Sequence, residues 1–151
     1  MKSAENWLRE YSVTHRHPVN KQIHQICVPA IFWSALALLW ACPTPTVIAP
    51  IPWLNWAMIV SVPVLLFYLS LGPKYFIGMA FATAATFYSC YQLEINGYRL
   101  GVIALVVFAA AWLGQFYGHK IEGKSPSFFT DLLFLLIGPL WVIEKLFPTR
   151  A

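Results

Sequence analysis

The chain has 151 residues, of which 59% are hydrophobic and only 11% charged, with a formal net charge of +4. An average soluble domain carries about 25% charged residues, so this composition argues against a soluble domain. No Lys, Arg, Asp or Glu occurs between Gln22 and Pro73, a stretch that a bilayer accommodates better than water does. We reject nucleic acid as the partner of the positive charge, because no basic patch with interleaved aromatic residues is present.

Four apolar segments are predicted to be membrane-spanning helices. Each approaches the roughly 20 residues that span about 30 Å of hydrocarbon. They are separated by a Pro-rich loop and by the breaks Gly72-Pro73 and Asn96-Gly97, and Pro63 is expected to kink the second segment. The predicted spans are Ile26–Cys42, Trp53–Leu71, Tyr75–Leu93 and Leu100–Gly118.

The apolar segment Phe128–Phe147 is predicted to form a re-entrant or interfacial helical hairpin. Gly138-Pro139 interrupts its middle, and each half is too short to span a bilayer. With four spans and a returning tail, Arg99 is the only basic residue expected on the outer side of the membrane. The positive-inside rule makes the opposite side, which holds the other basic residues, the cytoplasmic one. The basic residues expected there are Lys2, Arg9, Arg16, Lys21, Lys74, Lys120, Lys124, Lys145 and Arg150.

The sequence therefore predicts an all-α fold, namely a polytopic integral membrane helical bundle with about four transmembrane helices and a carboxyl-terminal hairpin. Residues 1–151 are expected to form a single membrane-embedded domain. The expected location is the bacterial inner membrane, or the endoplasmic reticulum if the source is eukaryotic.

Histidines are the first candidates for chemistry, because the predicted topology puts all of them on the cytoplasmic side. Pro18 disfavours one straight helix through the first three. A turn at His17-Pro18 would let His15 and His24 face one point, and Asn20 would then cap the helix that enters the first span. His17 alone also fits an ordinary interfacial side chain. The four histidines are His15, His17, His24 and His119.

A polar stripe marks the end of the fourth predicted span. Gln115, His119 and Glu122 have the spacing i, i+4, i+7, which places them on one helix face. Imidazole and carboxylate groups together suit non-haem iron, manganese or zinc. Two other interpretations stay open, since Glu122 is also able to pair with Lys120 or Lys124, and Gln115 to join helices through its amide.

Several kinds of site are excluded by what the sequence lacks. It has no GxGxxG, P-loop, GxSxG or CxxCH motif, so nucleotide, acyl-serine and c-type haem chemistry have no support. Four histidines are also too few for the several histidine boxes of membrane di-iron hydroxylases and desaturases. A single metal ion, in contrast, needs only three or four ligands.

Two motifs resemble the signatures of the membrane 2-hydroxy-fatty-acid dioxygenase family, formerly a domain of unknown function, which includes the yeast dioxygenase of phytosphingosine breakdown. The resemblance extends over essentially the whole chain. The motifs are Tyr11-x3-His15-x-His17-Pro18-x-Asn20-x3-His24 and Gln115-Phe116-Tyr117-Gly118-His119-x2-Glu122-x3-Pro126.

The resemblance implies an enzyme that uses Fe(II), with O2 as co-substrate, to shorten 2-hydroxy fatty acids by one carbon with release of CO2. Carried over by position, the metal ligands are His15, His24 and His119. Glu122 is a fourth ligand or a base. His17 stands where an Asn is expected in many members, which makes it an alternative ligand or a residue that supports the ligands.

Asn20 and Gln115 also match motif positions and, with Glu122, are the candidate catalytic residues. The expected partners are a 2-hydroxy fatty acid and the lipid bilayer. One alternative is a small membrane transporter or assembly subunit without enzymatic activity, which the scarcity of polar residues within the spans disfavours. Another is a zinc-dependent membrane hydrolase that uses the same histidines. The identity of the bound metal would distinguish this hydrolase from the dioxygenase.

Overall fold

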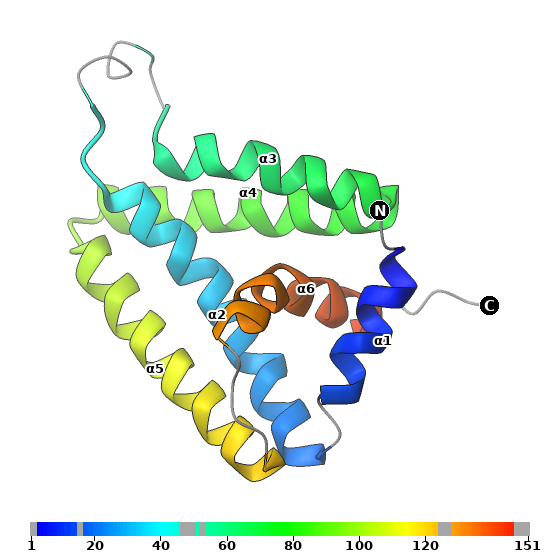
Figure 1. The fold of residues 1–151 in the computed structure, drawn as a ribbon. Helices are drawn as coiled ribbons and strands as arrows, with labels where there is room; N and C mark the ends of the chain where they lie inside the picture. Colours follow the sequence, from blue (N-terminus) through cyan, green and yellow to red (C-terminus); the bar gives the residue numbers. More distant parts are fainter. Residues whose placement is uncertain (1–2, 15–16, 46–50, 52–53, 124–127, 147–151) are drawn as a thin grey trace. The chain divides into compact units, whose positions relative to one another are not determined.

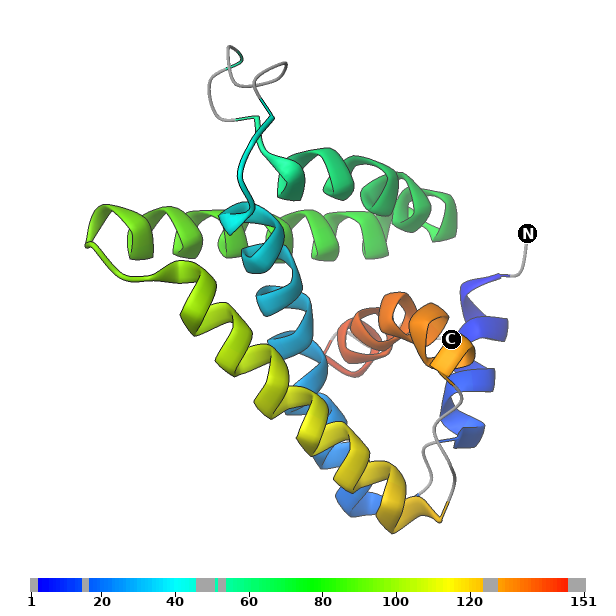
Figure 2. The same ribbon diagram turned by 60° about the vertical axis from the view of Figure 1, so that its left-hand side comes forward.

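A computed structural model describes residues 3–14, 17–45, 51, 54–123 and 128–146, without the side chains of residues 13–14, 128–135 and 146. Over this part of the chain the protein has six helices and no strand, which confirms the all-α prediction (Figures 1 and 2). The helices are α1 (Ala4–Thr14), α2 (Pro18–Ala41), α3 (Trp56–Leu71), α4 (Pro73–Ile95), α5 (Leu100–Glu122) and α6 (Phe128–Leu146).

Prolines and glycines set several of the helix boundaries, close to their predicted places. Pro18 and Pro73 are the first residues of α2 and α4, where a missing backbone N–H leaves no intrahelical hydrogen bond unmade. Gly72 separates α3 from α4 with φ +138°, a conformation that favours glycine. Asn55 caps α3, because its side-chain oxygen accepts the N–H of Met58 at 3.1 Å.

The hairpin predicted at the carboxyl-terminal end is wrong, since α6 is one helix with Pro139 inside it. Gly138 explains how the helix continues. A side chain at this position would meet the Val28 side chain at 3.0 Å and the Tyr11 hydroxyl at 3.5 Å, so glycine allows close packing. Tertiary packing of this kind compensates for the hydrogen bond that Pro139 does not donate.

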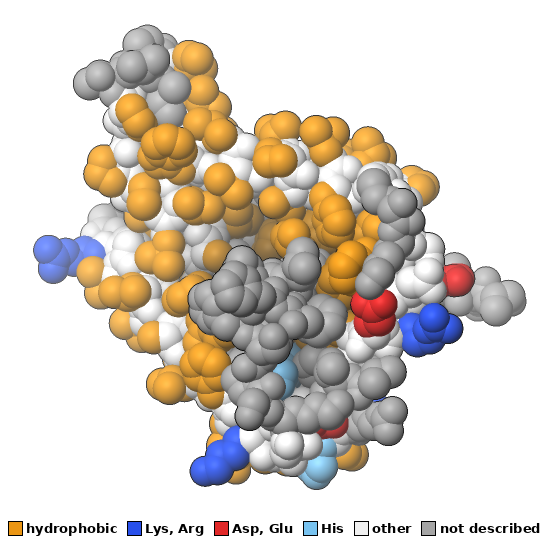
Figure 3. Space-filling model, viewed as in Figure 1, with side chains coloured by type: hydrophobic (Ala, Val, Ile, Leu, Met, Phe, Trp, Pro, Cys, Tyr) orange, Lys and Arg blue, Asp and Glu red, His pale blue; other side chains and the backbone are white. Residues whose placement is uncertain are grey.

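Two helices, α2 and α5, are long and apolar enough to cross a membrane. With 24 and 23 residues they are about 35 Å long, against about 30 Å of hydrocarbon. The four predicted spans are not confirmed, because α3 has only 16 residues and α4 is long enough but less apolar. Hydrophobic side chains nevertheless cover much of the visible surface of α3, α4 and α5 (Figure 3).

The chain divides into two compact units, and the prediction of a single domain is not tested by this division. The first unit consists of Met1–Phe32 and Ala109–Ala151, and the second of Trp33–Phe108. Helices α2 and α5 therefore contribute one part to each unit. All the candidate site residues that the structure describes belong to the first unit.

In the first unit, α1 packs against α6 (Figures 1 and 2). The buried rings of Tyr11 and Trp141 join the two helices, with their centroids 5.6 Å apart. Ile137 and Leu140 of α6 are also fully buried. Each large apolar side chain buried in this way contributes roughly 1.5–3 kcal/mol, so this core stabilises the packing of α1 against α6.

In the second unit, α3 lies along α4 (Figures 1 and 2). Indole N–H groups tie α2 to α4, because Trp33 donates to the Ser89 hydroxyl at 2.7 Å and Trp40 to the Glu94 carboxylate at 2.9 Å. A cluster of small and apolar side chains is buried between α2, α4 and α5. Its buried members are Ala37, Cys90, Leu100 and Ala104.

Replacing Gly138 with Leu is expected to destabilise the first unit, because the new side chain meets Val28 and Tyr11. Overpacking of this kind costs about 1–3 kcal/mol, which thermal unfolding of the detergent-purified protein measures as a lower melting temperature. Ala110→Leu, at an exposed position of α5, is the matched control and should leave the melting temperature unchanged. Equal melting temperatures for both variants would show that α6 does not approach α2 this closely.

Candidate metal site

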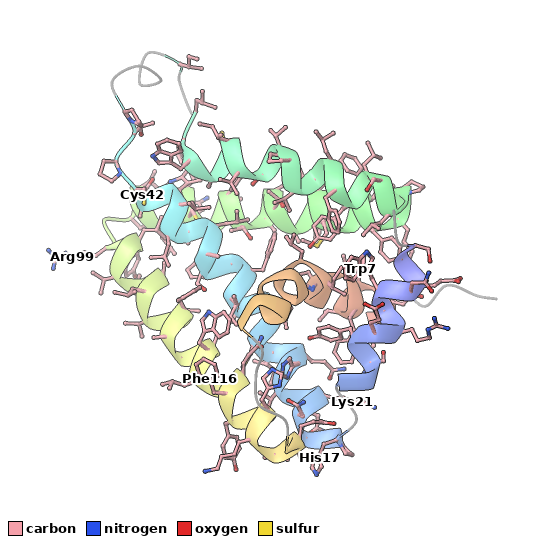
Figure 4. The ribbon with its side chains drawn as sticks, viewed as in Figure 1. Trp7, His17, Lys21, Cys42, Arg99 and Phe116 are labelled. Carbon is pink, nitrogen blue, oxygen red and sulfur yellow. The ribbon has the colours of Figure 1, made fainter. Side chains whose placement is uncertain are left out.

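The site is built on the first turn of α2, next to His17 (Figure 4). The ring Nδ1 of His17 accepts the backbone N–H of Val19 at 3.3 Å, and its carbonyl accepts the N–H of Lys21 at 3.1 Å. The expectation that Asn20 caps this helix is therefore wrong, because the helix already begins at Pro18. His17 is exposed, and the assignment of its ring as a metal ligand or supporting group stays a prediction.

Asn20 lies inside the first turn of α2 and is fully buried. Its side-chain Nδ2 donates to Glu122 Oε2 at 3.1 Å, which links α2 to the last residue of α5. The same carboxylate oxygen accepts the backbone N–H of His17 at 2.9 Å. A carboxylate at this place is favourable, because the N-terminus of a helix carries unsatisfied N–H groups and a partial positive charge.

His24 lies one turn further along α2 and is only 1% exposed. Its Nδ1 is 3.0 Å from the backbone carbonyl oxygen of Asn20. A carbonyl can only accept a hydrogen bond, so this contact places the proton of a neutral imidazole on Nδ1. Nε2 then keeps its lone pair, which is the arrangement found in histidines that bind metals through Nε2.

The other helix supplies His119, which is buried near the end of α5. The two imidazole rings meet edge to face, with centroids 5.0 Å apart and an interplanar angle of 88°. Gln115, one turn before His119 on the same helix face, is buried as well. The structure thus brings His24 and His119 together, as the two motifs predict.

Gly118 allows the two helices to approach at this level. A Cβ atom on Gly118 would overlap Asn20 Oδ1 and would lie 3.5 Å from Cε1 of His24. One helical turn earlier, a Cβ on Gly114 would lie 2.7 Å from the sulfur of Cys27. Gly118 belongs to the second motif but no role was predicted for it, although a glycine directly before a candidate ligand is a signal of close backbone approach.

Part of the predicted ligand set stays a prediction. His15 lies outside the described residues, and Lys124, a proposed partner of Glu122, does so too. Within the described residues, no group of three His, Cys, Asp or Glu side chains is arranged to hold a metal ion. The described donors nevertheless fit a metal with nitrogen and oxygen preferences, because two buried imidazoles lie beside an amide and a carboxylate.

Fold and site together define an all-helical protein with two helices suited to a membrane and a buried pair of histidines at its candidate site. The chain belongs to the family described as 2-hydroxy-palmitic acid dioxygenase Mpo1-like, whose model matches residues 1–149. This match confirms the family that the two sequence motifs resemble. No match was found among curated proteins or among solved structures.

Gly118→Ala is expected to destabilise the protein, since the added methyl group collides with the Asn20 side chain. Gly101→Ala is the matched control on the same helix, because its Cβ meets the Cβ of Ala41 at an ordinary 3.5 Å. Alanine gains up to about 1 kcal/mol in helix propensity, so the control should be neutral or more stable. Gly118→Ala should lose about 1–3 kcal/mol in thermal unfolding. A melting temperature as high as that of the control would contradict the close approach.

Proposed function

We propose that this protein is an Fe(II)-dependent dioxygenase that shortens 2-hydroxy fatty acids by one carbon. The observation that carries the proposal is the buried edge-to-face pair of His24 and His119, each on its own helix. Membership of the 2-hydroxy-palmitic acid dioxygenase Mpo1-like family supports both the reaction and the class of substrate. The proposed products are the shorter fatty acid, CO2 and water.

His24 and His119 are proposed to hold the iron, and His15 is the proposed third ligand. Bound Fe(II) would activate O2 and bind the hydroxyl and carboxylate oxygens of the substrate. The hydrogen bond from His24 Nδ1 to the Asn20 carbonyl supports this role, because it fixes the tautomer and the orientation of the ring. Burial of both side chains limits their contact with bulk water.

Gln115 is proposed to bind the substrate carboxylate. It is a buried amide one turn from His119 on the same helix face, and its two N–H groups suit a carboxylate oxygen. An arrangement in which a side chain binds the carboxylate near the reacting carbons holds the substrate in one orientation.

The proposed reaction is balanced without a further reductant. Conversion of a 2-hydroxy acid into CO2 and the acid one carbon shorter removes four electrons, and one O2 accepts four. The hydroxyl-bearing carbon becomes the new carboxyl group, and the bond to the old carboxyl carbon breaks. No flavin or 2-oxo acid is therefore required as a co-substrate.

The helices that carry the histidines also suit a lipid substrate. His24 lies in the second turn of α2 and His119 in the last turn of α5, so both are near the end of a long apolar helix. Before His119 in α5, apolar side chains such as Leu113 and Phe116 are exposed, and Phe116 points away from the helix (Figure 4). We propose that the acyl chain lies along such apolar helices while the head group reaches the metal.

The chain is proposed to be an integral membrane protein with its metal site on the cytoplasmic side of the membrane. Two helices of sufficient length and apolarity support membrane association. The cytoplasmic side is proposed from the positive-inside rule, applied to the basic residues that flank the four predicted spans. The membrane is the bacterial inner membrane, or the endoplasmic reticulum in a eukaryote.

Oxygen uptake by detergent-purified protein, loaded anaerobically with Fe(II), tests the proposal. With 2-hydroxypalmitate the protein should consume one O2 for each pentadecanoate and CO2 formed, and palmitate should cause no uptake. His24→Ala and His119→Ala should each lower turnover at least about a hundredfold, because loss of a ligand exceeds the effect of losing its support. Thr83→Ala removes a buried polar group from α4 and is the control that should retain turnover.

Either of two results would overturn the proposal. One is full turnover by both histidine variants, which would separate the reaction from the histidine pair. The other is the absence of oxygen uptake with every 2-hydroxy fatty acid tested from short to long chains. Tight binding of zinc with hydrolysis of an ester or amide substrate would instead favour a membrane hydrolase.

A further inference from the structure

Asn20 connects the carboxylate of Glu122 to the imidazole of His24 through two different groups. Its side-chain Nδ2 donates to Glu122 Oε2 at 3.1 Å. Its backbone carbonyl oxygen lies 3.0 Å from Nδ1 of His24. A continuous path of hydrogen bonds and covalent bonds therefore runs from the end of α5 to a candidate metal ligand on α2.

The carbonyl that His24 uses belongs to the first turn of α2. Helix ends fray, because their first N–H groups have no partners within the helix. Glu122 counters this fraying at two points, since its Oε2 accepts the backbone N–H of His17 at 2.9 Å as well as the Asn20 amide. Charge-assisted hydrogen bonds of this kind are stronger than those between neutral groups. Glu122 thus holds in place the turn that orients His24.

The Asn20 amide has one available orientation. A carboxylate only accepts hydrogen bonds, so Nδ2 faces Glu122 and Oδ1 faces the other way. Oδ1 lies where a side chain on Gly118 would be, is buried, and has no hydrogen-bond partner among the described residues. An exchange of the two amide ends would place Oδ1 against the carboxylate and lose the bond to Glu122. The amide is therefore held by Glu122 on one side and by the backbone at Gly118 on the other.

Among the described residues, Glu122 forms no group of three His, Cys, Asp or Glu side chains that could hold a metal ion. We propose that Glu122 is a positioning residue, which fixes the imidazole of His24 by acting through Asn20, and that it is not a metal ligand. The inference rests on the proposed function, because the purpose of the fixed imidazole is to present Nε2 to a metal. On this inference Glu122, the only carboxylate among the candidate ligands, leaves that set. It also gives Asn20 a specific role in the first motif.

The two roles of Glu122 differ in what Glu122→Gln does. Glutamine keeps an acceptor oxygen for the Asn20 amide and the His17 N–H, so a positioning residue tolerates this change. A carboxylate ligand does not, because a neutral amide oxygen binds a divalent cation far more weakly. Glu122→Ala removes the acceptor and is expected to release the first turn of α2 in either case.

The first experiment reads the His24 ring directly in the metal-free protein. Long-range 1H–15N correlation spectra of detergent-solubilised, 15N-histidine-labelled protein report which ring nitrogen is protonated, with His24→Gln identifying the His24 signal. The His24 ring should be in the Nδ1–H form in the wild type and in Glu122→Gln. In Glu122→Ala it should be present as a mixture of the two tautomers. Glu94→Ala is the matched control, since it removes a carboxylate that bonds to Trp40 in the other unit.

The second experiment titrates Co(II), a spectroscopic substitute for Fe(II), into the same proteins. Glu122→Gln should bind within about threefold of the wild-type affinity and with the same absorption spectrum. Glu122→Ala should bind about 10–100-fold more weakly, the usual effect of losing a group that supports a ligand, again with an unchanged spectrum. Glu122→Ala combined with Asn20→Ala should be no weaker than the weaker single variant, because the two residues act in one chain.

Two results would overturn the inference. One is an unchanged His24 tautomer in Glu122→Ala, which would show that Glu122 does not control the ring. The other is a Co(II) spectrum altered in Glu122→Gln, with affinity lost as severely as in Glu122→Ala, which would make Glu122 a ligand. A wild-type protein that binds neither Co(II) nor Fe(II) would contradict the proposed function instead, while the tautomer spectra would still decide the role of Glu122.

Discussion

The contact of α2 with α5 at Gly118 is the constraint on which the candidate site depends. The backbone of α5 comes so close that the place of a side chain on Gly118 is occupied by the amide of Asn20. Buried polar groups are costly unless they are hydrogen-bonded. Here Nδ2 of the Asn20 amide donates to Glu122, and Nδ1 of His24 donates to the Asn20 carbonyl. The close approach therefore brings His24 and His119 together and also provides the bonds that fix them.

The same contact joins the ends of two apolar helices at which the candidate site residues lie. The start of α2 and the end of α5 hold the histidines, the amides and the carboxylate, and both helices are otherwise apolar enough to cross a membrane. A helix terminus has unsatisfied backbone groups, so polar side chains are useful there at little extra cost. A substrate with a long acyl chain and a polar head group matches this division.

Much of the helical architecture follows from the sequence, because prolines, glycines and the lengths of apolar segments act locally. The breaks at Pro18 and Gly72-Pro73 lie where they were predicted. The carboxyl-terminal hairpin was wrong because the continuity of α6 through Pro139 depends on packing against Val28, more than 100 positions away in the sequence. Four membrane spans were predicted from apolar runs, and within the described part of the chain two helices meet both the length and the apolarity that a membrane span needs.

For the site, the motifs predicted which residues would be neighbours but not how they interact. The pairing of His24 with His119 was anticipated from their motifs, whereas Asn20, which was predicted to cap α2, lies inside that helix. The double hydrogen bond to Glu122 joins residues more than 100 positions apart, and no local pattern encodes such a contact. Whether His15 completes the site stays a prediction.

The most direct test of a mononuclear site at the histidine pair is elemental analysis of detergent-purified protein after anaerobic Fe(II) loading and removal of free metal. The wild-type protein is expected to retain about one iron per chain, and His24→Ala and His119→Ala are expected to retain almost none. Iron retained in full by both variants, or none retained by the wild type, would contradict the assignment of this pair as a metal site.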